Sequence, residues 1–369
     1  MKKERRIDKI YSLSPMQEGM LFHSLKDTEA LFYFEQYMFT LKGTINKAFL
    51  QESFNRVIKR HDILRTLFVY DKIQKPRQVV IEDLALDIHF EEISHLKEDE
   101  RKTYLEEFKK KDRARGFDLT RDLLMRVYLF KTGTNLYTLL WSSHHITMDG
   151  WSSGIFIKEL LQVYCALKKG DSTRFAPAIP FRNYIRWLEK QDRDEGLKYW
   201  KRYLEEYDQQ AALPKWGKPE EDGSHQAAEY DFTLDEVLTA GLIKTATDRQ
   251  VTINIVFQTL WGLLLQKYNN TDDVVFGMVV SGRPPELEGI ENMIGLFINA
   301  VPVRIQVHPQ QTFSQLVTRV RTSAAASKSY EYLPLADVQN LSLLKRELID
   351  HLVTFENYPV EEQMKEAET

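Results

Sequence analysis

The spacing of apolar side chains changes between strand-like and helical periods along the first third of the chain. Residues 34–43 (FEQYMFTLKG) alternate apolar and polar positions, which predicts a strand. Residues 46–60 place apolar side chains at helical spacing, and residues 76–93 predict a strand, a turn and a second strand. The highly charged residues 97–115 predict a helix whose outer face is solvated and carries ion pairs.

Local signals mark the start of a short helix near the N-terminus. Ser14 is a favourable N-cap, Pro15 suits the first helical position, and Gln17 completes a capping box. We therefore expect a helix from Pro15 to about Leu25.

Two apolar runs close to the middle of the chain predict neighbouring strands. They occupy residues 123–130 and 136–143 and are separated by the turn sequence KTGTN. The second run is apolar on both faces, as in a strand that is buried on both sides. A helix is expected from about Ser153 to Lys168, with Ser152 or Ser153 as its cap.

A looser segment, residues 169–180 (KGDSTRFAPAIP), separates two halves with a similar mixture of strands and helices. We therefore expect two α/β lobes, residues 1–175 and 176–369. The second half is expected to contain helices within 181–192 and 195–208, a loop at 209–228, a strand at 228–234, helices from about Asp235 and Ile253, strands at 273–282 and 300–307, a helix at 312–330 and a strand at 351–358.

The segment 251–268 (VTINIVFQTLWGLLLQKY) is the best candidate for a membrane span. It is too short, and Asn254 and Gln258 interrupt it. Its apolar side chains recur at helical spacing and predict a core helix with a buried stripe of Ile253, Val256, Phe257, Leu260 and Leu264.

Composition and charge narrow the class of protein. The chain has 369 residues, of which 43% are hydrophobic and 28% charged, as in globular proteins that fold in water. A net charge of −4 gives the whole chain no electrostatic match to nucleic acid. The single cysteine, Cys165, excludes a disulfide framework within the chain and a cysteine-built zinc site, and it fits a reducing cytoplasm.

The most informative stretch is LYTLLWSSHHITMDGWSSGIF, residues 136–156. His144 and His145 stand where the buried strand ends, and Asp149 and Gly150 follow in a turn that leads into a helix. Strand ends that open toward a helix are where α/β folds place their chemistry. Histidine changes charge near neutral pH, an aspartate can orient a turn or pair with an arginine, and glycine permits close approach of a ligand.

Other kinds of site fit the sequence less well. Adjacent histidines in a strand point to opposite faces, and no cluster of further ligands follows, which disfavours a metal site. The sequence contains no G-x-x-x-x-G-K-[ST] phosphate loop.

Several segments together resemble the condensation domains of nonribosomal peptide synthetases. The stretch HHITMDGWS resembles the family's H-H-x-x-x-D-G signature. The other matching segments occur in family order: LSPMQEGMLFHSL (13–25), KRHDILRTLF (59–68), FRNYIRWLEKQD and YWKRYL in mid-chain, SGRPPELEGIENMIGLFINAVPVRI (281–305), YLPLADVQ and LVTFENYP. The resemblance covers residues 7 to 359, nearly the whole chain.

The resemblance implies a fold and a reaction. The fold would be two chloramphenicol-acetyltransferase-like α/β lobes arranged as a V, with the active site in a tunnel between them. The reaction would be amide bond formation between a donor peptidyl or aminoacyl thioester and an acceptor aminoacyl thioester. Both substrates would arrive on phosphopantetheine arms of upstream and downstream carrier proteins, beside an adenylation domain. No tightly bound cofactor, metal, nucleic acid or membrane is expected.

The resemblance also assigns roles to individual residues. His145 would be the main catalytic residue, either as a general base or by orienting the amine, and the amide N–H of Gly150 is a candidate contact at the reacting centre. His144 would pack and hydrogen-bond beside it. Asp149 would pair with Arg283, bracing the turn from the facing lobe. Arg60 and Arg65 match the arginines of the family's second motif and would also order the site.

Several alternatives remain at this point. A free-standing coenzyme A-dependent acyltransferase has the same fold, and a catalytically silent recruitment domain would keep the fold and dock a partner enzyme. The stretches SPMQEGMLFHSL and HHITMDGWS, with a methionine before Asp149, resemble those of the subtype that takes a D-configured donor. Family domains usually continue beyond the LVTFENYP motif, so the last element of the second lobe is expected to be missing.

Overall fold

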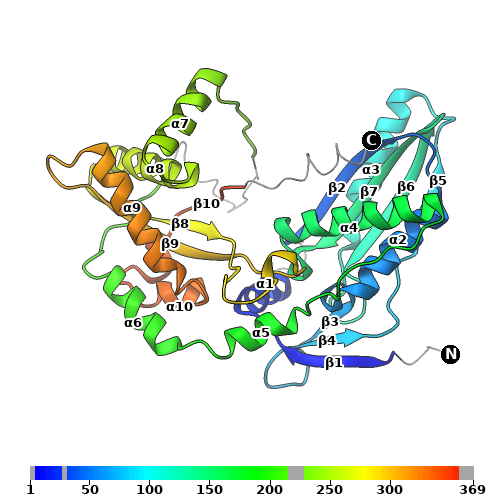
Figure 1. Ribbon diagram of the computed structural model, residues 1–369, viewed down its shortest axis with the longest axis horizontal. Coiled ribbons are helices and arrows are strands. Elements are labelled where there is room, and N and C mark those ends of the chain that lie inside the picture. Colours follow the sequence, from blue (N-terminus) through cyan, green and yellow to red (C-terminus); the bar gives the residue numbers. More distant parts are fainter. Residues whose placement is uncertain (1–4, 27–30, 215–227, 357–369) are drawn as a thin grey trace, which may run out of the picture. The chain divides into compact units, whose positions relative to one another are not determined.

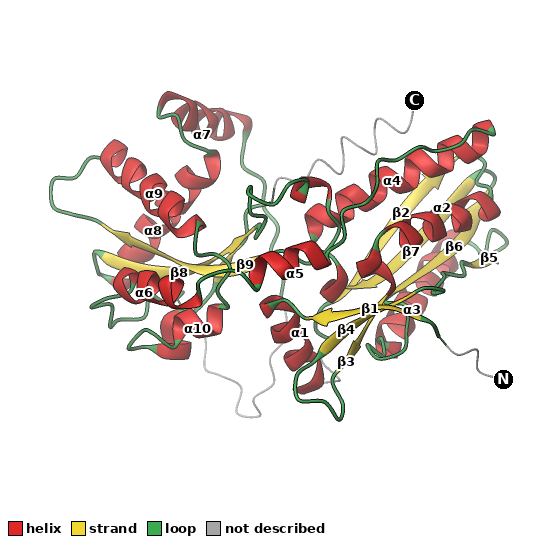
Figure 2. Cartoon of the chain, turned by 60° about the horizontal axis from the view of Figure 1, so that its bottom comes forward, coloured by secondary structure: helices red, strands yellow, loops and turns green. Residues whose placement is uncertain are grey.

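The computed structural model describes residues 5–26, 31–214 and 228–356, which divide into two units. The first unit comprises the chain up to Gln191 together with the segment Arg283–Ile298. The second comprises Asp192–Gly282 and Asn299–Glu356. Each unit combines a sheet with helices, so the expected α/β class is confirmed (Figures 1 and 2). The V arrangement of two lobes and the tunnel stay predictions.

The first unit is built around a four-stranded sheet. Its order is β2 (Phe34–Lys42), β7 (Leu136–His144), β6 (Met125–Gly133) and β5 (His89–Glu92), antiparallel except for the parallel pair β5 and β6. A smaller antiparallel sheet has the order β1 (Ile7–Ser12), β4 (Arg77–Ile81) and β3 (Thr66–Val69). The helices are α1 (Pro15–Lys26), α2 (Lys47–Arg60), α3 (Glu98–Arg115), α4 (Gly150–Lys169) and α5 (Arg182–Leu188).

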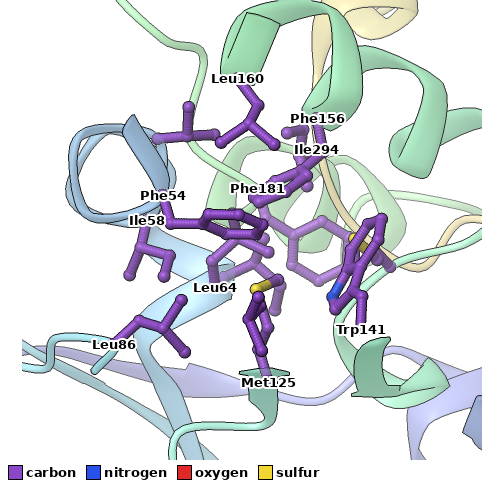
Figure 3. Packing of buried hydrophobic residues seen from close by; sticks show 14 of the residues in the cluster. Phe54, Ile58, Leu64, Leu86, Met125, Trp141, Phe156, Leu160, Phe181 and Ile294 are labelled. Carbon is purple, nitrogen blue, oxygen red and sulfur yellow. The ribbon is translucent and has the colours of Figure 1, made fainter. Parts of the chain in front are cut away.

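Helices cover both faces of the four-stranded sheet. On one face α2 and α4 lie side by side, and Phe54 of α2 and Phe156 of α4 pack with Trp141 of β7 (Figure 3). On the other face, Phe108 of α3 packs against Phe130 of β6. Burial on both sides explains why the β6 and β7 segments are almost continuously apolar.

The second unit has a three-stranded sheet with the order β10 (Leu352–Val353), β8 (Asp273–Val280) and β9 (Asn299–Gln306). Its helices are α6 (Arg193–Tyr203), α7 (Glu236–Asp248), α8 (Ile253–Asn269), α9 (Phe313–Lys328) and α10 (Leu335–Gln339). Leu265 of α8 and Leu316 of α9 pack on one face of the sheet. Trp200 of α6 and Val338 of α10 belong to a separate cluster on Val275 and Val301.

The boundary between the units differs from residues 175 and 176, where the sequence suggested it. The chain enters the second unit only after Gln191, because α5 buries Tyr184 and Ile185 in the core of the first unit. The segment Arg283–Ile298 then returns to the first unit, where Ile294 joins the same core (Figure 3). Local composition cannot reveal a segment that returns from far along the chain.

Most predicted elements are confirmed, and the exceptions lie in the second unit. The strand expected at 228–234 is wrong: these residues are irregular, and Tyr230 and Phe232 are 87% and 74% exposed, so their alternation packs on no sheet. The strand expected at 351–358 is reduced to β10, with 357–358 outside the described residues. Residues 209–214 are irregular, as expected of the loop, whereas 215–227 lie outside the described residues.

The buried stripe predicted for α8 is also wrong in detail. Val256 is buried, but Phe257, Leu260 and Leu264 are 40%, 40% and 45% exposed. The face that meets the sheet instead carries small and polar side chains together with Leu265, because the helix approaches β9 closely. A Cβ atom added at Gly262 would lie only 2.6 Å from Ile305 Cδ1, so only glycine fits there.

No helix in the described part of the chain combines the length and apolar character needed to cross a membrane.

Candidate active site

The end of β7 positions the two histidines. His144 is the last residue of β7, and its Cα pairs with Phe34 in the register with β2. The backbone N–H of His145 donates to Tyr33 O at 2.8 Å, and His145 then starts a 3₁₀ turn, His145–Thr147. The two histidines therefore sit at the point where the strand ends and the chain turns toward α4.

His144 is buried against aromatic rings. Its ring centroid lies 6.4 Å from that of Tyr33 and 6.5 Å from that of Phe117, and its Nδ1 accepts a hydrogen bond from Ile146 N at 3.2 Å. Burial, with a smaller effect of His145, lowers the pKa of His144 to about 4. A ring that is neutral at pH 7 and holds the turn in this way suits packing and hydrogen bonding.

His145 presents one ring nitrogen for chemistry. Its Nδ1 lies 2.8 Å from Met148 O, and because a carbonyl oxygen only accepts, Nδ1 carries the hydrogen. In the neutral ring, Nε2 is therefore left with its lone pair. Nε2 lies 3.5 Å from Glu35 Oε1, and the side chains of His145 and Glu35 remain 21% and 26% exposed. This is the arrangement of a histidine that can accept a proton at Nε2.

Asp149 holds the turn after His145 together. It is the N-cap of α4, and its Oδ1 accepts from Ser152 N at 2.9 Å. The same oxygen accepts from Arg283 Nη2 at 3.3 Å, while Oδ2 accepts from Phe297 N at 3.0 Å. The sequence suggested Ser152 or Ser153 as the cap; α4 begins three residues before Ser153 because the aspartate supplies the capping oxygen.

Arg283 belongs to the same unit as Asp149, not to a facing lobe as expected. It donates through Nη1 to the carbonyl oxygens of Ile290 and Met293, and its guanidinium lies 4.0 Å from the Phe297 ring centroid. The predicted pair does form, but Arg283 also organises its own segment. Arg283 and Phe297, both between β8 and β9, thus brace the turn by their contacts with Asp149.

Ser152 is a second link in this brace, whereas the sequence pattern suggested only a capping role for it. Its hydroxyl donates to Gly295 O at 2.7 Å and accepts from Gly295 N and Arg283 Nη2 at 3.1 and 2.9 Å. Gly150 is the first residue of α4 and has no positive φ. Backbone conformation therefore does not require a glycine at this position.

Arg60 and Arg65 belong to two separate hydrogen-bond networks. Arg60 Nε is 3.1 Å from both carboxylate oxygens of Glu159, and His61 Nε2 is 2.7 Å from Glu159 Oε2. Burial would raise the pKa of Glu159, but the hydrogen bond and charge of His61 and the charge of Arg60 outweigh it and lower that pKa. Arg60 thereby joins α2 to α4.

Arg65 lies in a separate network in the small sheet. Its Nη1 donates to Ile81 O at 2.8 Å, and its Nη2 is 3.2 Å from carboxylate oxygens of Asp8 and Asp62. The hydrogen bonds of Arg60 and Arg65 to described residues go to groups other than His145. That these two arginines order the site stays a prediction.

The opening motif reaches the site through Gln17. The capping box is present, with Ser14 N donating to Gln17 Oε1 at 2.9 Å and Gln17 N donating to Ser14 Oγ at 3.2 Å. Gln17 is fully buried, and its Nε2 also donates to Ile146 O at 3.1 Å. A glutamine that serves as an N-terminal capping residue thus also holds the turn that follows His145, which the sequence pattern alone could not reveal.

Glu35 is the other residue that the sequence analysis missed. It occupies a polar position in the alternation of β2, which by itself indicates only solvent exposure. Its proximity to His145 follows from the pairing of β2 with β7, two strands that are far apart in the sequence. Within the described residues, no cluster of three or more His, Cys, Asp or Glu side chains is arranged to hold a metal ion.

Comparisons with known proteins identify the family of the chain. The model of the Condensation domain family matches residues 7–369. Gramicidin S synthase 2 of Brevibacillus brevis is 44% identical over 363 residues, covering 98% of this chain and 8% of that protein. The chain therefore spans less than a tenth of the length of this relative.

Solved structures share the fold. The first condensation domain of the calcium-dependent antibiotic synthetase, in complex with a substrate analogue, matches with a TM-score of 0.73 and 19% identity over 94% of this chain and 81% of that one. A four-domain nonribosomal peptide synthetase bound to AMP and glycine matches with a TM-score of 0.74 and 19% identity over 99% of this chain and 28% of that one. With the family model matching nearly its whole length, the chain belongs to the condensation-domain family.

Proposed function

We propose that this chain catalyses amide bond formation between a donor peptidyl or aminoacyl thioester and an acceptor aminoacyl thioester, both carried on phosphopantetheine arms of carrier proteins. The observation that carries the proposal is the hydrogen bonding of the His145 ring. Met148 O fixes Nδ1 at 2.8 Å and leaves Nε2 to receive a proton from an incoming amine. Membership of the condensation-domain family supports the substrate class.

The proton accounting fits a single imidazole. An α-ammonium group carries three protons: one remains in the amide, one leaves on the thiol, and one passes to solvent. The C–N bond forms as the C–S bond breaks. His145 Nε2 can take a proton from the amine and return it to the departing thiolate, so the histidine is unchanged after one turnover.

Positioning supplies a large share of the rate in this proposal. An α-amino group has a pKa of roughly 7.7–8.0, so a useful neutral fraction exists before any base acts. Holding two tethered thioesters in the right geometry converts an encounter into an effectively unimolecular step. The N–H of Gly150, in the first turn of α4, is available to contact developing negative charge because first-turn N–H groups lack helical acceptors.

Two other functions compete with this one. A coenzyme A-dependent acyltransferase would use the same histidine, whereas a silent recruitment domain would need neither His145 nor a braced turn. The buried network of Asp149, Ser152 and Arg283 around that turn favours a chemical role over recruitment.

The experiment uses a donor carrier and an acceptor carrier, each loaded with an aminoacyl thioester, and measures dipeptidyl product by mass spectrometry. We expect product with the carriers, none when acyl-coenzyme A replaces the donor, and a loss of about 10²–10⁴-fold in rate for His145→Ala. His89→Ala, at an exposed position, is the matched control. Unchanged turnover by His145→Ala would overturn the proposal.

The proposal also names partner domains, a cellular compartment and a preferred stereochemistry of the donor. Partners would be the upstream donor carrier, the downstream acceptor carrier and a neighbouring adenylation domain, in the cytoplasm, where the single cysteine stays reduced. The methionine at position 148 supports the D-donor subtype. Loading the donor carrier with D- and L-residues in parallel tests that preference, and equal rates would contradict it.

A further inference from the structure

Glu35 stands beside the one ring nitrogen of His145 that is left for chemistry. It lies on β2, where its Cα pairs with Ser143 of β7, next to the pair of Phe34 with His144. Its Oε1 is 3.5 Å from His145 Nε2. The carboxylate therefore comes to the reacting histidine from a different strand than the histidine motif itself.

Glu35 Oε1 and His145 Nε2 are both hydrogen-bond acceptors when the ring is neutral. With Nδ1 donating to Met148 O, Nε2 of the neutral ring can only accept, and a carboxylate also only accepts. Their separation of 3.5 Å is longer than the roughly 2.7–2.9 Å of a charge-assisted N–H···O bond, so the pair is not closed as a tight ion pair. A group that donates two N–H bonds from a single positive centre can bridge these two atoms.

We propose that Glu35 binds the α-ammonium group of the acceptor substrate and presents it to Nε2 of His145. This inference rests on the proposed function, in which that amine is the nucleophile. The α-amino group is mostly protonated at pH 7, so a carboxylate at this place recruits its predominant form. Glu35 would then be a substrate-binding residue of the acceptor side.

The same carboxylate stabilises the charge after proton transfer. When Nε2 takes one ammonium proton, the positive charge moves from the amine to the imidazolium, and both positions are neighbours of Glu35. The neutral amine then attacks the thioester carbonyl, and the imidazolium returns its proton to the leaving thiolate. The second proton released by the amine passes to solvent.

Glu35 is not needed to orient the His145 ring or to hold the turn. The orientation of the His145 ring is already set by Met148 O, and the turn is held by Asp149 and Gln17. The Glu35 side chain is 26% exposed, as suits a group that meets a substrate.

The other titratable groups around His145 do not compete for this role. His144 on β7 is neutral at pH 7, because burial lowers its pKa to about 4. Tyr33, just before β2, stays a neutral phenol because burial raises its pKa. Asp149 in the same turn is paired with Arg283. The carboxylate facing Nε2 in the described residues is that of Glu35.

The direct test measures binding rather than turnover. Alanyl-pantetheine and lactoyl-pantetheine, both joined through an unreactive amide in place of the thioester, differ in an ammonium against a hydroxyl group. Titration of each at pH 6.5 is followed by the ¹⁵N resonance of His145 Nε2. We expect a saturable shift with the alanyl probe, at least about tenfold tighter than with the lactoyl probe.

Glu35→Gln keeps the size and strand position of the side chain but removes its charge. We expect this variant to lose the preference for the alanyl probe, while the matched control Glu92→Gln, at an exposed position paired with Lys131, keeps it. Wild-type protein that binds both probes equally, or a Glu35→Gln variant that keeps the full preference, would overturn the inference.

Kinetics give a second readout that a structural role would not produce. With loaded carriers, Glu35→Gln should lower kcat/KM for the acceptor about tenfold at pH 7 and much less at pH 9, where the amine is neutral without help. An equal loss at both pH values would contradict the inference. If wild-type protein forms no product but retains the alanyl preference in the titration, the proposed function fails and the ammonium site stands.

Discussion

Arg283 Nη2 lies 3.3 Å from Asp149 Oδ1, and the two side chains are 5% and 1% exposed. The pair joins residues 134 positions apart and ties the segment between β8 and β9 to the turn after His145. Both carboxylate oxygens of Asp149 accept hydrogen bonds, from Ser152 N, Arg283 Nη2 and Phe297 N. The turn that carries the histidine is therefore held by a buried carboxylate whose two oxygens both accept hydrogen bonds.

Asp149→Asn should destabilise the protein as well as lower its activity. The amide has one acceptor oxygen, so its NH₂ group must face Arg283 or the Phe297 N–H and leaves a buried donor or charge unsatisfied. We expect a loss of about 3 kcal/mol in the free energy of unfolding, measured in urea.

The control for Asp149→Asn is Glu52→Gln. Glu52 pairs with Arg56 at 2.7 Å, but both side chains are close to half exposed. A surface pair of this kind contributes less than about 1 kcal/mol. If the two variants unfold at the same urea concentration, the buried pair does not stabilise the turn.

Local patterns were sufficient for much of the first unit. The capping box of Ser14 and Gln17, the helical period of α2 and the apolar runs of β6 and β7 depend on neighbours in the sequence, and these elements are confirmed. The strand predicted at 228–234 failed because alternation alone does not supply a partner strand.

The candidate site was likewise predictable only where its residues are neighbours in the sequence. His144, His145 and Asp149 are adjacent in the sequence and were found there, whereas the contact of His145 with Glu35 depends on strand pairing between distant segments. Family resemblance suggested the partner Arg283 but not its unit, because the return of residues 283–298 to the first core is a tertiary event.

His144 should make the protein less stable in mild acid. In the unfolded chain histidine has a pKa of roughly 6.5, and burial lowers that of His144 to about 4 in the fold. The unfolded state therefore binds more protons between these values, so this contribution is present above pH 6.5 and is lost as the pH falls toward 4. Its size is roughly 2–4 kcal/mol.

Urea unfolding of wild-type protein and of His144→Phe at pH 7.5 and 5 measures this contribution. We expect a smaller fall in stability between the two pH values for the variant, even if its stability at pH 7.5 is lower. His89→Gln, which changes an exposed histidine, should fall as the wild type does. Equal falls for His144→Phe and wild type would show that His144 does not contribute.

Two adjacent leucines of α8 should respond differently to truncation. Leu265 is fully buried in the cluster on β8 and β9, while Leu264 is 45% exposed. Leu265→Ala should cost about 2–5 kcal/mol because it removes buried carbon and leaves a cavity. Leu264→Ala should change the free energy of unfolding by less than about 1 kcal/mol. A larger loss for Leu264→Ala would mean that the originally predicted stripe, not the observed one, faces the core.

Glu331 should destabilise the second unit above neutral pH. Burial raises its pKa to about 7, against a weaker opposing effect of Lys328, while an unfolded glutamate has a pKa of roughly 4.3. The folded state therefore binds more protons than the unfolded state between these values, and stability falls as the pH rises from about 4.3 through 7.

Glu331→Gln removes this penalty and should raise the melting temperature at pH 8 while changing it little at pH 4.5, where wild-type Glu331 is protonated in the fold. The Glu331 backbone carbonyl still accepts from Asn299 Nδ2 in the variant, so the loop keeps its anchor. Glu205→Gln, at an exposed position, serves as the charge control and should show no such pH dependence. An equal shift at both pH values would mean that side-chain packing, rather than the buried charge, accounts for the difference.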